Sequence, residues 1–232
     1  MIDFTPWSQM LRTYVAQGQV DYARWQKESA KTLDQWLERV QSVDLDSMDR
    51  KSAIAFLLNL YNALVIRQVL QKYPIDSIRP EVFGIPNWAS FLLFFKQPVY
   101  RLGDRSLSLD NIEHDILRAQ YNESRIHFAL VCAATGCPLL RAEAYTPDLV
   151  LEQLEADAQR FIRNPVKVNY DAASGTLYCS KIFKWYEDDF VAHMGSVASY
   201  IQLYLPETTL PANINIVHLP YSWQLNAQRT CL

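Results

Sequence analysis

The segment from Asp49 to Tyr73 carries the run AIAFLLNLYNALVI, which is apolar on nearly every side of a helix. A helix that is hydrophobic all round must be enclosed by other parts of a protein or by lipid. Two asparagines interrupt the run, which is shorter than the roughly 18 uninterrupted apolar residues that a bilayer span requires. Pro74 follows the segment and ends the helix. The sequence therefore predicts one central buried helix and no membrane span.

The two asparagines of this helix, Asn59 and Asn62, are three residues apart and share a face. A buried amide must find hydrogen-bond partners, because an unpaired polar group inside a protein costs free energy. Asn59 and Asn62 therefore either hold neighbouring loops in place or line a pocket. Holding loops is the more common role of buried polar groups, and both residues are also candidates for substrate binding.

The remaining pattern indicates helices first and strands afterwards. Apolar residues recur at three- and four-residue steps from Phe4 to Val15 and from Asp21 to Val40, which predicts two amphipathic helices. The apolar cluster from Ala89 to Lys96 is expected to be buried. Gly103-Asp104 and Ser174-Gly175 each separate two short alternating runs, which predicts two hairpins. This order favours an α+β fold, with a helical N-terminal half and a small, largely antiparallel sheet in the C-terminal half of a single domain.

Charge and composition exclude several functional classes. The 232-residue chain has a formal net charge of −3, so it lacks the basic surface typical of proteins that bind nucleic acid or anionic membranes. Its first residues, MIDFTPWSQMLRTYV, contain neither the basic region nor the apolar region of a secretory signal, which favours a cytoplasmic location. Phosphate-loop, serine-hydrolase and zincin motifs are absent from the sequence, so we expect no cofactor. The expected partner is a small-molecule or peptide ligand, and no pattern indicates an oligomeric state.

The stretch from Arg125 to Leu140, RIHFALVCAATGCPLL, carries the strongest candidate for chemistry. Its apolar run from Ile126 to Ala133 suits a strand buried on both faces, which leads into a turn of small residues before Cys137. If Pro138 begins a short helix, Cys137 is its N-cap, where unpaired amides and the helix dipole favour a thiolate. Against a reactive role, most cysteines are buried and inert.

A thiol nucleophile generally requires a base, and His114 is the preferred candidate among the four histidines. An antiparallel return of the chain can place the start of its helix beside the end of the strand that leads to Cys137. His127 lies early in the same strand, and its side chain should stay about 10 Å or more from Cys137. Its expected role is that of a buried histidine that fixes a helix end or Arg125. Glu113 is the third candidate catalytic residue, although a capping box that begins at the end of the preceding loop explains it equally well.

Further residues could contribute to binding. Arg125, His127, Tyr221 and Trp223 join the two asparagines as candidates for substrate binding. Tyr221 and Trp223 are expected to close the core, but aromatic side chains with a polar tip also line pockets.

The capping box proposed for Glu113 begins at Asp110, three residues before it. The four cysteines, Cys132, Cys137, Cys179 and Cys231, form no C-x-x-C pair and are expected to be reduced. Metal binding is the competing chemistry, because histidines and thiols are both available near residues 114–137. No familiar zinc spacing occurs, and Cys132 would face away from His127 on an alternating strand, so we expect no metal site.

Several segments together resemble a family numbered 547 among the domains of unknown function. These segments are VDYARW (Val20–Trp25), NLYNALVI (Asn59–Ile66), SLDNIEHDILR (Ser108–Arg118), RIHFALVCAATGCPLL (Arg125–Leu140), FKWYEDDF (Phe183–Phe190) and LPYSWQLN (Leu219–Asn226). The resemblance implies a single domain over residues 3–227 and a C-terminal tail over residues 228–232. It implies no activity, because the family is named for the lack of one.

Two functional hypotheses follow. In the first, the protein is a thiol-dependent hydrolase or acyl transferase in which Cys137 attacks, His114 accepts its proton, and helix amides after Pro138 stabilise the oxyanion. In the second, the protein is a non-catalytic binding domain whose polar residues form one internal hydrogen-bond network. The members of that network would be Asn59, Asn62, Glu113, His114, Arg118, Arg125 and His127.

Overall fold

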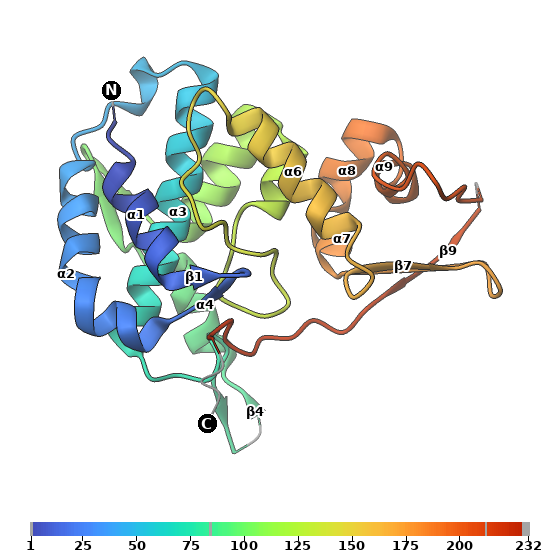
Figure 1. Cartoon of the computed structure of the whole chain (residues 1–232), viewed down its shortest axis with the longest axis horizontal. Coiled ribbons are helices and arrows are strands. Elements are labelled where there is room, and N and C mark those ends of the chain that lie inside the picture. The colour runs from blue at the N-terminus through green and yellow to red at the C-terminus, as the bar shows by residue number, and fades with distance from the viewer. Residues whose placement is uncertain (1, 84, 212, 229–232) are drawn as a thin grey trace.

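Helix α3, from Arg50 to Lys72, is the centre of the fold in the computed structural model, which describes residues 2–83, 85–211 and 213–228 (Figure 1). Asp49 caps the helix by accepting hydrogen bonds from the backbone amides of Lys51 and Ser52. By length and composition α3 could cross a membrane, but 94% of its most apolar window is buried inside the fold. The predicted central buried helix is confirmed.

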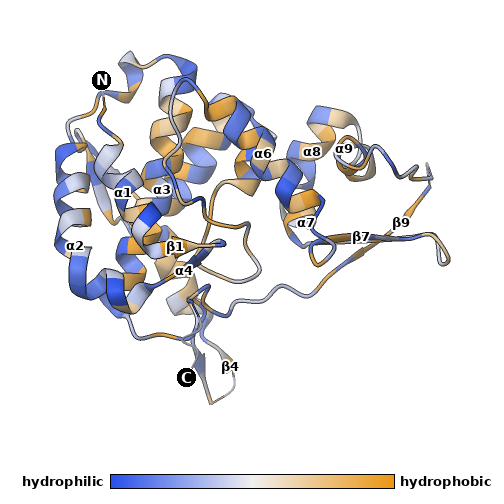
Figure 2. Cartoon of the chain, viewed as in Figure 1, coloured by the Kyte–Doolittle hydropathy of each residue, from blue (hydrophilic) through white to orange (hydrophobic). Residues whose placement is uncertain are grey.

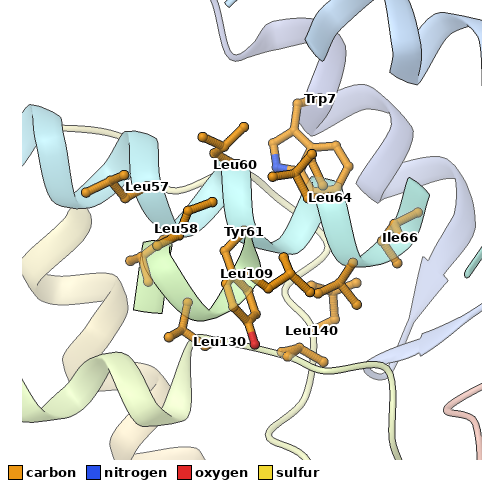
Figure 3. Packing of buried hydrophobic residues seen from close by; sticks show 14 of the residues in the cluster. Trp7, Leu57, Leu58, Leu60, Tyr61, Leu64, Ile66, Leu109, Leu130 and Leu140 are labelled. Carbon is orange, nitrogen blue, oxygen red and sulfur yellow. The ribbon is translucent and has the colours of Figure 1, made fainter. Parts of the chain in front are cut away.

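The helices and strands of the N-terminal half pack around α3. The main core contains Trp7, Leu64 and Leu140 beside Tyr61 and Leu130 (Figure 3). Outside it, α2 shows hydrophilic colours along much of its length (Figure 2). The elements of this half are α1 (Thr5–Tyr14), β1 (Val15–Ala16), β2 (Gln19–Val20), α2 (Tyr22–Arg39), η1 (Leu45–Ser47), β3 (Glu81–Val82), β4 (Ile85–Pro86), α4 (Trp88–Lys96), β5 (Tyr100–Leu102), β6 (Arg105–Leu107), η2 (Asn111–Arg118) and α5 (Ala119–Tyr121).

Helix α4 differs from the sequence prediction, because it is only partly buried. Phe94 is buried, whereas at least half of the surface of Trp88, Leu92 and Leu93 is exposed. The helical period explains this result: an apolar helix nine residues long presents one face to the core and the other to solvent. The expectation that the whole segment is buried was therefore wrong.

A second hydrophobic core lies in the C-terminal half, around Phe128, Phe183 and Phe190. Strands β7 and β8 pair antiparallel, as the hairpin prediction required, and β9 pairs parallel to β8. Small sheets and helices concentrated in the N-terminal half confirm the predicted α+β class. The elements of this half are η3 (Ser124–Phe128), α6 (Val150–Ile162), β7 (Val168–Asp171), β8 (Thr176–Cys179), α7 (Ile182–Trp185), α8 (Glu187–Met194), α9 (Val197–Gln202) and β9 (Asn215–His218).

The predicted strand from Ile126 to Ala133 is absent. Its first residues form the 3-10 helix η3, and the chain then continues without regular structure. The Asn62 side chain binds this segment in place of a strand, because its amide donates to the Ala129 carbonyl and its oxygen accepts from the Val131 amide, both at 3.0 Å. Side-chain hydrogen bonds have thus replaced a β-ladder.

The C-terminal segment, residues 221–228, returns from the second core to the main core (Figure 1). It forms isolated bridges at Gln224, Leu225 and Ala227 with three separate parts of the chain. The Gln228 amide also donates to the Val20 carbonyl, so the ordered contacts extend one residue beyond the predicted domain end. Residues 229–232, which include Cys231, lie outside the described residues.

Candidate functional site

A cavity of about 480 Å³ lies where the two cores meet. Its walls come from α3, α4, η2, η3, the loop after η3, α7 and the C-terminal segment, and they combine aromatic with charged side chains. Cavities of this size that are mostly apolar with a few polar groups are typical of small-molecule sites. The lining residues are Tyr61, Arg79, Trp88, Phe91, Phe95, Asp110, Glu113, His114, His127, Leu130, Cys132, Cys137, Pro138, Lys181, Ile182, Trp185, Tyr186, Tyr221 and Trp223.

The cavity brings together most of the residues that the sequence suggested for a site. The three candidate catalytic residues, Cys137, His114 and Glu113, all line it, as do His127, Tyr221 and Trp223. The other three candidates, Asn59, Asn62 and Arg125, do not line it.

The Cys137 sulfur accepts two hydrogen bonds. The backbone amide of Cys132 and the hydroxyl of Tyr221 each donate to Sγ, both at 3.1 Å. Burial by itself would raise the pKa of Cys137, but hydrogen bonds from the Cys132 and Tyr221 side chains and from the backbone outweigh this effect and lower the pKa to about 7. These hydrogen bonds therefore favour ionisation of Cys137 relative to a free thiol.

The helix predicted after Pro138 is not present, because residues 138–146 have no helical structure. Leu139 instead packs against the turn at Gly18, so closely that a Cβ atom at position 18 would lie 2.7 Å from the Leu139 side chain. The Leu139 carbonyl accepts a hydrogen bond from Arg160. Cys137 is consequently not a helix N-cap, and the proposed helix amides are not available to an oxyanion. Individual hydrogen bonds take the place of the helix dipole in stabilising the thiolate.

The loop that carries Cys137, residues 132–137, is held against the C-terminal segment. The Gly136 amide donates to the Ser222 carbonyl, and a Cβ atom at Gly136 would lie 2.8 Å from that carbonyl oxygen and from the Tyr221 ring. Glycine is therefore required for the close approach that brings the Tyr221 hydroxyl to the sulfur.

A lysine from the second half of the chain also fixes this loop. Lys167 Nζ donates to the carbonyls of Thr135 and Gly136 at 2.9 and 2.8 Å. Ala133 has a φ of 63°, in the left-handed region that costs energy for a residue with a Cβ atom. The loop thus has a tight conformation that its neighbours maintain.

His127 lies on η3 and forms a pair with Asp189 of α8. Its Nε2 is 2.6 Å from Asp189 Oδ2, its ring stacks on Tyr186 with centroids 3.7 Å apart, and its side chain is fully buried. Burial lowers the pKa of His127, which favours the neutral ring. Although burial opposes it, hydrogen bonds from His127 and Arg118 hold the pKa of Asp189 well below its ordinary value.

The protonation state of His127 follows from these contacts. A neutral ring beside an ionised carboxylate places its proton on Nε2, so Nδ1 keeps a free lone pair. This Nδ1 is buried and has no hydrogen-bond partner among the described residues. The argument that His127 lies far from Cys137 assumed a strand that is absent from the structure. Both residues line the same cavity.

His114 is placed differently. Arg118 Nη1 is 2.9 Å from His114 Nδ1, and because a guanidinium can only donate, Nδ1 must be the acceptor. In the neutral ring the proton is then on Nε2, which is 3.8 Å from Asp110 Oδ1 and beyond ordinary hydrogen-bond distance. His114 is therefore arranged as a hydrogen-bond donor rather than as the base that the sequence suggested.

Glu113 is not part of a capping box with Asp110, whose side chain makes no cap hydrogen bond. The cap is formed instead by Ser108 and Asn111, whose side chains each accept a hydrogen bond from the other residue's amide. Glu113 Oε1 accepts a hydrogen bond from the Tyr186 hydroxyl. Glu113 therefore has no capping role, and its buried side chain lines the cavity.

The remaining candidates have structural roles. Asn59 binds the indole of Trp7 and both backbone groups of Tyr145, and Arg125 is held by Glu123 and Glu155. Together with the contacts of Asn62 described above, these hydrogen bonds confirm that both asparagines hold loops in place. Among the described residues, Asn59, Asn62 and Arg125 form no hydrogen bond to His114 or His127. The single network of the binding-domain hypothesis is therefore divided into separate parts.

Two residues of the site were missed by the sequence analysis. Tyr186 binds Glu113 and stacks on His127, and Asp189 binds His127 and Arg118. Both belong to FKWYEDDF, a segment already noted for its resemblance to a family, and that is the signal that could have identified them.

Among the described residues, no group of three or more His, Cys, Asp or Glu side chains is arranged to hold a metal ion. Cys132, Cys137 and Cys179 are free thiols.

Comparisons with known proteins give one match. The model of a family described as "Protein of unknown function, DUF547" matches residues 45–162. This range contains Glu113, His114, His127 and Cys137 but ends before Tyr186, Asp189 and Tyr221. No curated protein and no solved structure matches the chain.

Proposed function

We propose that this chain, which belongs to the DUF547 family, is a thiol-dependent hydrolase or acyl transferase with Cys137 as its nucleophile. The observation that carries the proposal is the environment of the Cys137 sulfur. Two hydrogen bonds of 3.1 Å and a pKa of about 7 favour the thiolate in a cavity of about 480 Å³. A thiolate is the reactive form of cysteine toward an electrophilic carbon.

His127 takes the role of base in this proposal. Its Nδ1 has no hydrogen-bond partner among the described residues, and Asp189 holds the ring through Nε2 as the carboxylate of a nucleophile–base–carboxylate arrangement holds its base. His127 could accept a proton from the thiol or from water that attacks an acyl-enzyme. It replaces His114, whose Nδ1 already accepts from Arg118.

His114 instead serves as a donor to the substrate. His114 lines the cavity, and its Nε2 lies 3.8 Å from Asp110 Oδ1, beyond ordinary hydrogen-bond distance. A carbonyl oxygen that gains negative charge during attack is stabilised by such a donor. In this proposal His114 supplies the stabilisation that the sequence analysis had assigned to helix amides.

The lining of the cavity suggests a compact, partly aromatic or amphipathic acyl substrate. The lining includes the aromatic side chains of Trp88, Trp185 and Trp223. Arg79 and Lys181 add positive charge to the cavity. Arg79 lies over the rings of Trp88 and Trp223 at 5.5 and 5.6 Å. This arrangement favours a substrate with an apolar body and a negatively charged group.

Acylation of Cys137 by a small activated ester, such as a p-nitrophenyl ester, tests the proposal. We expect release of p-nitrophenol together with a mass increase on the Cys137 peptide, and loss of both in Cys137→Ser. His127→Gln should slow hydrolysis of the acyl-enzyme, whereas the control Cys179→Ser, which removes a thiol from β8 outside the cavity, should behave as the wild type. Equal esterase rates for wild type and Cys137→Ser would refute the proposal.

One observation favours the second candidate, a non-catalytic binding domain. Cys137 is only 3% exposed, and its sulfur already has two donors, as expected of a structural thiol. If the cavity only binds ligands, Cys137 should react with iodoacetamide no faster than a free thiol at pH 7, with a rate that rises near pH 8.5.

A further inference from the structure

A second sulfur lies beside the nucleophile. Cys132 also lines the cavity, and its Sγ is 3.5 Å from the Tyr221 hydroxyl oxygen, to which the Cys137 sulfur is 3.1 Å. The Cys132 amide contacts the Cys137 sulfur directly, at 3.1 Å. The sulfur atoms of Cys132 and Cys137, which belong to one short loop, therefore both lie within 3.5 Å of the Tyr221 hydroxyl oxygen.

The two thiols differ in protonation. Contact with the Cys137 sulfur, followed by burial, raises the pKa of Cys132 well above its ordinary value, whereas the pKa of Cys137 is about 7. The contacts thus favour ionisation of the Cys137 sulfur and disfavour ionisation of its neighbour. This is the arrangement of an attacking thiolate and a resolving thiol.

We propose that Cys132 and Cys137 are a reversible oxidation site that closes to an intramolecular disulfide when a hydroperoxide enters the cavity. The loop geometry carries this proposal: four positions separate the two cysteines, yet the Cys132 amide lies 3.1 Å from the Cys137 sulfur and both sulfurs contact the same Tyr221 hydroxyl. Disulfide formation requires Cα atoms roughly 4.4–6.8 Å apart, and the proposal therefore requires the loop to bring the two Cα atoms within that range.

The chemistry proceeds in two steps. The Cys137 thiolate attacks one peroxide oxygen, so that an S–O bond forms, the O–O bond breaks, and the departing alkoxide or hydroxide takes a proton from water. The Cys132 sulfur then attacks the Cys137 sulfenic acid, so that the S–S bond forms and the S–O bond breaks. The released hydroxide takes the Cys132 proton and leaves as water. The thiol pair is oxidised by two electrons, and the hydroperoxide is reduced to an alcohol or water.

The disulfide would control the site already proposed. It removes the lone pair with which Cys137 would attack an acyl group, and a thiol reductant restores it. This regulatory consequence rests on the proposed function. The formation of the disulfide does not, because it requires only the two sulfurs and the oxidant.

The test uses the full chain with Cys231→Ser, since Cys231 lies outside the described residues. The reduced protein is treated with hydrogen peroxide, free thiols are blocked with N-ethylmaleimide, and the digested peptides are measured by mass spectrometry. We expect a Cys132–Cys137 linkage with loss of two hydrogens, reversed by dithiothreitol. The control Cys179→Ser should give the same linkage, because Cys179 is fully buried in the second core.

Variants of the pair separate the two steps. In Cys132→Ser the Cys137 sulfenic acid should persist and react with dimedone, and in Cys137→Ser neither product should form. Cys132→Ala gives the same test if the serine variant fails to fold, as judged by circular dichroism. Sulfinic acid on Cys137 without any Cys132 linkage in the wild-type pair would overturn the proposal, as would oxidation of Cys132 in preference to Cys137.

The outcome is independent of acyl chemistry. Ester turnover without a disulfide would leave the proposed function intact and refute the oxidation site. A disulfide in a protein that Cys137-directed esters never acylate would support the oxidation site and refute the hydrolase or transferase.

Discussion

Replacing Tyr221 with phenylalanine should raise the pKa of the Cys137 thiol. The Tyr221 hydroxyl donates one of the two hydrogen bonds to Sγ, and the substitution removes this donor while keeping the ring. A hydrogen bond to a charged group contributes about 1.5–3 kcal/mol, and one pKa unit corresponds to about 1.4 kcal/mol. The pKa should therefore increase by about 1–2 units from its value of about 7.

The assay is alkylation by iodoacetamide from pH 5 to pH 10, with labelling of the Cys137 peptide followed by mass spectrometry. Because only the thiolate reacts, an increase of 1–2 units lowers the rate at pH 7 by about 5- to 50-fold. The rates of variant and wild type should converge above the higher pKa. Tyr178→Phe is the matched control, because it removes a hydroxyl from β8 outside the cavity. Superimposable pH profiles for Tyr221→Phe and wild type would refute the assignment of Tyr221 as a stabiliser of the thiolate.

Three other changes test the supports of the site. Asn62→Ala leaves two buried backbone groups unpaired and should lower the free energy of unfolding by about 1–3 kcal/mol in urea titration; an unchanged midpoint would contradict this role. Gly136→Ala places a Cβ atom 2.8 Å from the Ser222 carbonyl, so it should lower the free energy of unfolding by about 1–3 kcal/mol and move the Cys137 pKa toward about 8.5. Neither change would be observed if the loop could shift freely. Asp189→Asn should destabilise the fold by about 1–2 kcal/mol at neutral pH. The pKa of Asp189 is held below its ordinary value, so the carboxylate stabilises the fold above about pH 4, and this stabilisation is lost as the pH falls through the pKa of the folded state. The melting temperatures of Asp189→Asn and wild type should therefore differ at pH 7 and converge in strong acid.

Much of the fold could be predicted because its signals are local. The apolar run and the Asp49 cap define α3, and turn residues define the β5–β6 and β7–β8 hairpins. Each of these patterns depends on residues only a few positions apart. The family resemblance noted in the sequence agrees with the match over residues 45–162.

The stretch that carries Cys137 could not be predicted in the same way. Its apolar residues match a strand, but the partners of its backbone are the Asn62 side chain and the C-terminal segment, which lie about 70 and 90 positions away in the chain. A short apolar run does not indicate whether a β-ladder or side chains will satisfy its backbone. The expected distance between His127 and Cys137 was argued from that strand and therefore loses its basis.

The candidate site shows the same division. Residue types identified Cys137, His114 and Glu113, and all three line the cavity. The choice of base depended on proton positions, which follow from Arg118 on His114 and Asp189 on His127. The Asp189–His127 contact joins residues 62 positions apart on different elements, so no spacing in the sequence could reveal it. Arg118 and His114 lie four positions apart on η2, but spacing alone does not say which ring nitrogen accepts the hydrogen bond.

The hydrogen bonds that favour the Cys137 thiolate depend on a segment 84 positions further along the chain, at Tyr221. Tyr221 belongs to the last part of the described chain, and the backbone of the cysteine loop is anchored there through the Ser222 carbonyl. Without this segment the cavity lacks both the phenol that donates to the sulfur and the Trp223 side chain of its wall. The environment that favours the thiolate is therefore complete only when residues 221–228 have folded onto the cysteine loop.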